Sequence, residues 1–268
     1  AHGDVAGDGA VDLKAVRLAL PPLNDHPAAF SVELYAVLIE LIRGCGSVLD
    51  PFAGTGRIHQ IAEMAGVPIS VGVELEREWS NWEMYQRGPR RQIIGDSLVV
   101  VPGLRRQFGA VLTSPVYANR MSDHHHAKDP CKKCVGTGLR TSPAGLVLNC
   151  QSCRGSGLSR RNTYTHRLGR PLSTNSAAGM QWGEPYRELH RAAWSVCAAK
   201  LTPGGRFVVN VSNHIRKHVE IDVIGWHSEV LAEVGLEFVE RIDVSTRRQK
   251  HGANADKRTG SEAVLVFA

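Results

Sequence analysis

Hydrophobic and polar positions alternate along this chain in blocks, first at helical spacing and then in short apolar runs. In residues 28–44 apolar side chains recur every three or four positions, and Gly44 follows the last of them, where a helix would end. The apolar positions of this block are Phe30, Leu34, Val37, Leu38, Leu41 and Ile42. Residues 47–66, SVLDPFAGTGRIHQIAEMAG, predict a strand, a glycine turn and a helix, and residues 68–76 predict a second strand.

The alternation continues to the end of the chain. Residues 76–87 are helix-like, and apolar runs predict strands at residues 92–94 and 109–115. The later blocks predict helices at 184–201 and 223–235 and strands at 203–213, 236–245 and 262–268. Strands that alternate with helices favour a mostly parallel α/β sheet with helices on both faces. Residues 1–21 predict an irregular lead-in.

Composition places the chain among soluble globular proteins, with 43% hydrophobic and 22% charged residues. No apolar run approaches the roughly 20 residues that a membrane span needs. The opening residues AHGDVAGDGA lack the basic and apolar parts of a signal peptide. We therefore expect an intracellular protein with no membrane partner.

Positive charge is concentrated in one segment. Between Arg120 and Arg170 ten Lys or Arg residues stand against two acids, whereas the whole chain carries a net charge of +6. Such an excess suits a polyanion such as nucleic acid, because neutralised phosphates release condensed counterions. A solvated loop of the same charge is the alternative.

Side chains suited to binding a ligand follow three predicted strands in succession. Asp50 precedes a turn that contains Gly54 and Gly56, Glu74 ends the second strand, and Asp96 and Ser97 follow the third. Open α/β sheets bind ligands at the carboxyl ends of their strands, where a carboxylate can accept both hydroxyl hydrogens of a ribose. Taken singly, each acid also fits a helix cap or a solvated turn. The glycine turn also lacks the third glycine of G-x-G-x-x-G, the usual dinucleotide-binding pattern.

In that order, DPFAGTG (50–56), the acid of VGVELE (71–76), GDSL (95–98) and TSPVY (113–117) resemble the S-adenosylmethionine-dependent methyltransferases that modify exocyclic amino groups of DNA bases. The resemblance covers most of residues 22–268. It implies a Rossmann-like class I methyltransferase fold, with a mostly parallel seven-stranded sheet and a C-terminal antiparallel hairpin. It also implies that Asp50, Phe52, Gly54 and Gly56 surround S-adenosylmethionine, Glu74 holds its ribose, and Asp96 and Ser97 hold its adenine.

The resemblance gives TSPVY the catalytic role. Ser114 Oγ and the Pro115 carbonyl would accept hydrogen bonds from the target amine, and Tyr117 would stack on a base flipped out of duplex DNA. Val116 departs from the family pattern, which has a second proline there, so the rigidity of this loop is open. Ser114 favours N4 of cytosine over N6 of adenine.

Four cysteines form a C-x2-C-x15-C-x2-C pattern inside the basic segment: Cys131, Cys134, Cys150 and Cys153. Two such pairs can bind one structural zinc ion, and disulfides or a redox motif are the alternative. Their sequences, CKKCVGTG and CQSCRGSG, also resemble the zinc knuckles of DnaJ-type chaperones. We expect a catalytic domain of residues 22–119 and 159–268, interrupted by a basic zinc ribbon at 120–158 that either contacts DNA or only staples the insertion.

The hypothesis that unites these features is a DNA methyltransferase. N6-adenine methylation, RNA methylation and a catalytically inactive, zinc-containing binding protein on the same scaffold are the alternatives.

Overall fold

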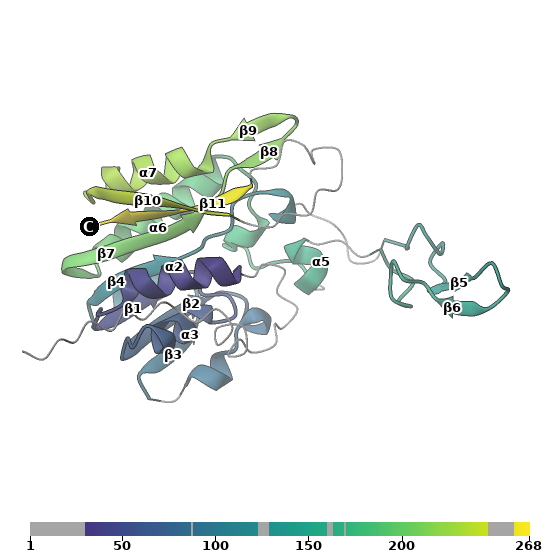
Figure 1. Cartoon of the computed structure of the whole chain (residues 1–268), viewed down its shortest axis with the longest axis horizontal. Helices are drawn as coiled ribbons and strands as arrows, with labels where there is room; N and C mark the ends of the chain where they lie inside the picture. Colours follow the sequence, from purple (N-terminus) through teal and green to yellow (C-terminus); the bar gives the residue numbers. More distant parts are fainter. Residues whose placement is uncertain (1–29, 87, 123–128, 160–162, 169, 246–259) are drawn as a thin grey trace, which may run out of the picture.

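The computed structural model describes residues 30–86, 88–122, 129–159, 163–168, 170–245 and 260–268 (Figure 1). Its helices are α2 (Val32–Ile42), α3 (Arg57–Met64), α4 (Ser97–Gly103), α5 (Tyr164–Leu168), α6 (Glu184–Ala198) and α7 (Val223–Glu233). Its strands are β1 (Ser47–Asp50), β2 (Ile69–Glu74), β3 (Arg90–Ile94), β4 (Phe108–Thr113), β5 (Leu139–Thr141), β6 (Val147–Asn149), β7 (Leu201–Val211), β8 (His214–Arg216), β9 (Val219–Ile221), β10 (Phe238–Ser245) and β11 (Ser261–Phe267). The predicted irregular lead-in, residues 1–21, lies outside the described residues.

Seven strands form one sheet in the order β10-β11-β7-β4-β1-β2-β3. Strands β7, β4, β1, β2 and β3 are mutually parallel, and β11 runs antiparallel to both β7 and β10. This arrangement confirms the mostly parallel Rossmann-like sheet with a C-terminal antiparallel hairpin. The chain moves outward from β1 in both directions, so the boundary between β1 and β4 is the switch point where open α/β sheets bind ligands.

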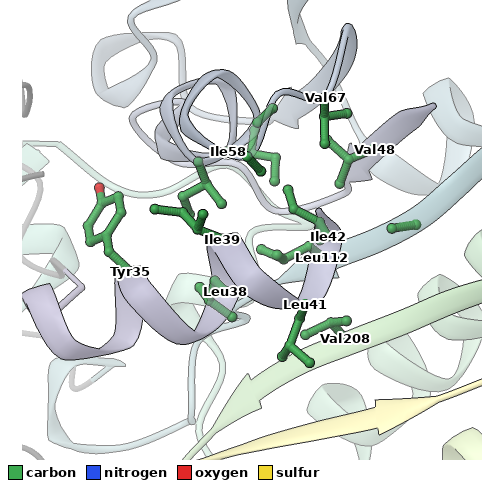
Figure 2. Close-up of a cluster of buried hydrophobic side chains, with 14 of the residues drawn as sticks. Tyr35, Leu38, Ile39, Leu41, Ile42, Val48, Ile58, Val67, Leu112 and Val208 are labelled. Carbon is green, nitrogen blue, oxygen red and sulfur yellow. The ribbon is translucent and has the colours of Figure 1, made fainter. Parts of the chain in front are cut away.

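Helices cover both faces of the sheet, because neighbouring residues of each buried strand point to opposite sides. Leu112 of β4 and Val208 of β7 belong to a buried cluster with residues of α2 and α3, and Figure 2 shows them beside α2. Val111 and Val209, one position away on the same strands, pack against α6 and α7 on the opposite face. The apolar runs of the sequence are therefore continuous because both faces are buried.

The helix termini follow ordinary capping chemistry. Ser31 Oγ accepts the Leu34 N–H at 3.1 Å at the start of α2, and Asp222 Oδ1 accepts the Gly225 N–H at 2.9 Å at the start of α7. Among the described residues, no helix combines the length and apolar character that crossing a membrane would require.

One local prediction is wrong, and one hairpin was not predicted. The predicted helix at 76–87 is replaced by two short 3₁₀ helices, Arg77–Trp79 and Trp82–Tyr85, because the backbone of Ser80 is extended (φ −80°, ψ 136°) and interrupts a continuous helix; residue 87 lies outside the described residues. The predicted strand at 203–213 is followed by an additional hairpin, β8–β9. Its turn residues Lys217 and His218 both have positive φ, 49° and 65°, without the Asn or Gly that marks such turns in a sequence.

Candidate functional site

A cavity of about 350 Å³ lies at the carboxyl edge of the sheet. Nine of the ten residues expected to bind the cofactor or act on the target contribute to its lining: Asp50, Phe52, Gly54, Glu74, Asp96, Ser97, Ser114, Pro115 and Tyr117. They come from the ends of β1, β2, β3 and β4, which are neighbouring strands. The fold thus brings two sequence-defined sets of residues into one space.

The tenth residue, Gly56, does not line the cavity, but it shapes the turn that contains Gly54. Its φ is 79°, and a Cβ there would come within 2.8 Å of the Tyr85 ring. The turn is also held from behind, because Gln92 Nε2 donates to the Gly54 carbonyl at 3.1 Å. Gln92 Oε1 in turn lies 2.9 Å from Nε2 of the buried His59. Backbone conformation and a buried hydrogen-bond chain therefore fix the glycine turn before any ligand binds.

Glu74 is held by backbone donors. Its Oε2 accepts the Gly54 N–H at 2.9 Å and its Oε1 accepts the Glu76 N–H at 2.8 Å. Burial raises the pKa of Glu74 to about 7 despite these two donors, and the charges of Glu76 and Asp50 raise it further. The pKa of Asp50 is also raised to about 7 by burial, although Oδ1 accepts the Phe52 N–H at 3.0 Å.

Asp96 lines the cavity and is also a helix cap, which is one of the roles that the sequence left open. Its Oδ1 accepts the Leu98 N–H at 2.9 Å as the N-cap of α4, and its Oδ2 accepts Asn175 Nδ2 at 3.0 Å. Ser97 Oγ donates to the Pro51 carbonyl and so ties the third strand end to the first. Asp96 and Ser97 thus use part of their hydrogen-bonding capacity for contacts within the protein.

The segment that follows the insertion forms another wall of the cavity. Asn175, Ser176, Ala177 and Ala178 line it, and the Ser173 N–H donates to Glu76 Oε1 at 2.7 Å. Arg170, which the sequence assigned to the basic segment, pairs with Glu76 at 2.8 Å and Glu78 at 2.7 Å. Its charge is therefore neutralised within the protein.

The TSPVY loop contributes Ser114, Pro115 and Tyr117 to the other end of the cavity. Ser114 Oγ and Tyr117 Oη lie 3.1 Å apart. Ala118, the next residue, has φ 52°, a left-handed conformation that costs roughly 1–2 kcal/mol in a residue with a Cβ. Surrounding contacts must therefore hold this loop in place.

Val116 supplies two of these contacts. Its side chain packs against a cluster formed by Trp79, Tyr164 and Ala178. Its carbonyl accepts the hydroxyl of the buried Tyr186 at 2.8 Å. The position where the family pattern has a second proline is thus fixed by packing and by a buried hydrogen bond.

Tyr186 is itself held by a buried chain from α6 and α7. Trp194 Nε1–H donates to His227 Nδ1 at 2.9 Å, so the proton of the neutral imidazole resides on Nε2, which lies 3.0 Å from Tyr186 Oη. Burial lowers the pKa of His227 well below its usual value, which keeps the ring neutral. The Tyr186 hydroxyl therefore accepts from His227 and donates to Val116.

Two further polar residues at this end of the cavity escaped the sequence analysis. Asn210 lies in the apolar run of β7, and its Nδ2 is 3.2 Å from Ser114 Oγ, 2.8 Å from Tyr117 Oη and 2.9 Å from Glu262 Oε2. Glu262, near the start of β11, lines the cavity. Glu262 could have been predicted from the direction of β11. The first residues of this antiparallel strand lie at the edge of the sheet where the parallel strands end.

Charge in the cavity favours a cationic ligand. Four acids line it, Asp50, Glu74, Asp96 and Glu262, against one guanidinium, that of Arg57. Apolar side chains such as Phe52 and Leu98 form much of the remaining wall. Because the pKa values of Asp50 and Glu74 are about 7, the negative potential inside the low-dielectric walls grows as pH rises above 7.

The four predicted zinc ligands meet in a second, separate cluster. The Sγ atoms of Cys131, Cys134, Cys150 and Cys153 all lie within 4.8 Å of one another, and the four side chains are buried. The Sγ–Sγ distances of 4.0 Å for Cys131–Cys150 and 3.6 Å for Cys134–Cys153 bracket the roughly 3.8 Å that Zn–S bonds of about 2.3 Å give in a tetrahedron. None of the four forms a disulfide. The donor set therefore fits structural zinc.

Glycines explain how the two cysteine knuckles fold against each other. A Cβ on Gly138 would come within 2.2 Å of the Gly155 carbonyl oxygen, and a Cβ on Gly157 would come equally close to that of Gly136. The Gly138 N–H also donates to Cys134 Sγ at 3.3 Å. The repeated C-x-x-C-x-G-x-G pattern thus packs two backbones at a distance that only glycine permits.

The surface of this ribbon combines positive charge with exposed apolar side chains. Lys132, Lys133, Arg140 and Arg154 are exposed, and residues 130–158 contain no acid. Val135, Leu139, Leu146, Val147, Leu148 and Leu158 are exposed as well. Figure 1 shows β5 and β6 apart from the large sheet. Arg120, Lys128, Arg160 and Arg161, also part of the basic segment, have side chains outside the described residues.

No protein-family model and no curated protein matches this chain. Solved structures with a similar fold include a putative RNA methyltransferase from Pyrococcus horikoshii, with 13% identity, 95% of each chain covered and a TM-score of 0.48. The N-methyltransferase NodS from Bradyrhizobium japonicum shares 10% identity over 87% of this chain and 91% of its own, with a TM-score of 0.47. Precorrin 8W decarboxylase from Methanobacterium thermoautotrophicum shares 13% identity over 93% of this chain and all of its own, with a TM-score of 0.46.

Proposed function

We propose that this protein transfers a methyl group from S-adenosylmethionine to the exocyclic amine of a base flipped out of DNA, with N4 of cytosine as the preferred target. One observation carries the proposal. A single cavity joins the three acid-bearing strand ends to Ser114, Pro115 and Tyr117, so that a cofactor and an amine can lie side by side.

The chemistry of the cavity fits the cofactor. S-adenosylmethionine supplies an electrophilic methyl group on a positively charged sulfur, and the acids of the cavity suit that charge. We assign its ribose to Glu74, whose carboxylate is oriented by the Gly54 and Glu76 N–H groups and keeps lone pairs for two hydroxyls. We assign its adenine to the wall formed by Asp96 and Ser97, to which the structure adds Asn175.

The other end of the cavity suits an amine target. The lone pair of an exocyclic amine is delocalised into the base, so the amine attacks poorly unless acceptors draw its hydrogens toward a tetrahedral arrangement. Ser114 Oγ and the Pro115 carbonyl are such acceptors, and both are preorganised by the fixed Val116 carbonyl and the packed loop. This support replaces the rigidity that a second proline would have given.

Nucleic acid is the partner that the ribbon favours. Four exposed basic residues and no acid between residues 130 and 158 give a surface complementary to phosphates, and the exposed apolar side chains beside them can contact sugars and bases. We propose that zinc, bound by the four cysteines, holds this surface in shape. In this proposal the ribbon grips DNA next to the flipped base.

Product analysis tests the proposal. The purified protein is incubated with radiolabelled S-adenosylmethionine and either unmodified plasmid DNA or ribosomal RNA, and the digested nucleosides are separated and identified. We expect label in N4-methylcytosine from DNA. Label in N6-methyladenine would show that adenine is the target base, and label in RNA alone would show that RNA is the substrate. Absence of label from both would contradict methyl transfer to nucleic acid.

A further inference from the structure

Four side chains at the target end of the cavity form one hydrogen-bonded group that ends in a carboxylate. Besides the 3.1 Å contact between Ser114 Oγ and Tyr117 Oη, Tyr117 Oη donates to Glu262 Oε2 at 3.4 Å. Asn210 Nδ2 faces the oxygen atoms of all three residues. Ser114, Tyr117 and Glu262 line the cavity, whereas Asn210 is fully buried behind them.

The positions of the hydrogens follow from what each group can donate. A carboxylate only accepts, so the single Tyr117 hydroxyl hydrogen points to Glu262. The Ser114–Tyr117 contact then requires that Ser114 donate to Tyr117 Oη. Asn210 carries two hydrogens on Nδ2, and its two shortest contacts are those to Tyr117 and Glu262. The opposite amide orientation would place Oδ1 against the carboxylate, which is repulsive.

This pattern leaves the lone pairs of Ser114 directed to the cavity. Because the Ser114 hydrogen is committed to Tyr117, its oxygen faces an incoming amine as an acceptor. A serine hydroxyl without such a partner is free to rotate and present its hydrogen instead, which would repel the amine hydrogens. The group therefore fixes Ser114 in the form that the proposed reaction needs.

Resting on the proposed function, we infer that Glu262 is the final acceptor of the proton that the target amine loses, and that it acts through Tyr117 and Ser114. The target nitrogen bonds to the methyl carbon while the carbon–sulfur bond breaks and its electron pair passes to sulfur. The nitrogen then gives one proton to Ser114 Oγ, Ser114 gives its proton to Tyr117 Oη, and Tyr117 gives its proton to Glu262 Oε2. Atoms and charge balance, because the cationic sulfur becomes neutral and the carboxylate becomes a carboxylic acid that later releases its proton to water.

The fold explains why an acid from the end of the chain can serve here. Strand β11 runs antiparallel to β7, with Ala263 opposite Val211. The start of β11 thus lies beside the end of β7, where Asn210 is located. Asn210 is a positioning residue in this scheme, since it holds Tyr117 and Glu262 at the same time.

Two variants interrupt the relay at different points. Glu262→Gln keeps an acceptor for Tyr117 but cannot take a proton, and Tyr117→Phe keeps the ring but removes the link between Ser114 and Glu262. We expect each to lower kcat at least about tenfold, with KM for DNA and equilibrium binding of S-adenosylhomocysteine and plasmid DNA within twofold of wild type. The double variant should be no slower than the slower single variant, because both changes break one chain. Glu262→Asp should recover part of the loss.

Glu240→Gln is the matched control, since Glu240 is an exposed acid on the neighbouring strand β10, and we expect its kcat to equal that of wild type. Full activity of Glu262→Gln, or losses in the two single variants that multiply in the double, would overturn the relay while wild-type methyl transfer stands. Absence of transfer by the wild-type protein would instead overturn the proposed function. Equal loss of binding and kcat in Glu262→Gln would also contradict the relay, since it would show that the residue acts on structure.

Discussion

The sheet and the four-cysteine ribbon are held together in opposite ways. The sheet is stabilised by apolar side chains buried on both faces, and its cavity is shaped by buried hydrogen bonds such as those of Glu74 and Tyr186. The ribbon has four buried cysteines as its core and leaves its large apolar side chains exposed. The comparison teaches that a preorganised cavity needs a large packed body, whereas four cysteines on two tight knuckles can form the core of a small unit if, as we propose, they bind a metal ion.

Removal of zinc is expected to have the largest effect, confined to the ribbon. Structural zinc contributes on the order of 10–16 kcal/mol of apparent binding free energy in small domains, and residues 129–159, as far as the structure describes the ribbon, bury only the four cysteines as a core. Cys131→Ser should therefore abolish stoichiometric zinc and make residues 129–159 sensitive to protease, while the melting temperature of the sheet changes by a few degrees at most. Cys197→Ser, on α6 in the sheet body, is the control that should keep the zinc. Cooperative loss of both regions in Cys131→Ser would contradict their independence.

Loss of the Tyr186 hydroxyl is expected to have an intermediate effect, confined to the sheet body. Tyr186→Phe leaves the Val116 carbonyl and His227 Nε2–H without their partner, which should lower the free energy of unfolding by about 1–3 kcal/mol. Because Val116 lies within the TSPVY loop, methyl transfer should fall more than affinity for S-adenosylhomocysteine. Chemical denaturation measures the free energy of unfolding, calorimetry measures the affinity, and the nucleoside assay measures methyl transfer. Unchanged stability and unchanged transfer would show that the loop does not need this anchor.

The pH dependence of cofactor binding is expected to be the smallest effect. With a pKa of about 7, Glu74 is protonated below that pH and then accepts ribose hydroxyls poorly, so affinity for S-adenosylhomocysteine should decrease as pH falls through 7 and level off above it. The decrease for one group is at most about tenfold per pH unit, or 1.4 kcal/mol. Asp50 titrates in the same range, so the contribution of Glu74 is the part that Glu74→Gln removes.

Glu63→Gln, on the exposed side of α3, should keep the wild-type pH dependence of this binding. An affinity that is constant between pH 6 and 8 in the wild-type protein would contradict the assignment of Glu74 to the ribose.

The sequence predicted those parts of the molecule that depend on local pattern. Continuous apolar runs gave the buried strands, because each strand is covered on both faces, and cysteine spacing indicated the four-cysteine cluster. The residues around the cavity could also be predicted from the sequence. Parallel strands place their carboxyl ends at one edge of the sheet, so the residues that follow successive strands are expected to lie together.

The parts that escaped prediction depend on contacts between distant segments. Glu262 is 148 positions from Ser114 in the chain and reaches it only because β11 is antiparallel. Arg170 belongs to the basic segment of the sequence, but it pairs with Glu76 and Glu78, which precede it by more than 90 residues. Tyr186, whose hydroxyl donates to the Val116 carbonyl, is indistinguishable in the sequence from any other apolar position of a helix.

The central claim is that Ser114 and its surroundings transfer a methyl group to a DNA base, and a paired nucleoside assay tests it most directly. Wild-type protein and Ser114→Ala are incubated with S-adenosylmethionine and unmodified plasmid DNA, and methylated nucleosides are quantified by mass spectrometry, with S-adenosylhomocysteine affinity measured for both. The account predicts N4-methylcytosine from the wild-type protein and at least about a tenfold loss in Ser114→Ala with cofactor affinity unchanged. Equal methylation by the two proteins, or none by the wild type, would contradict it.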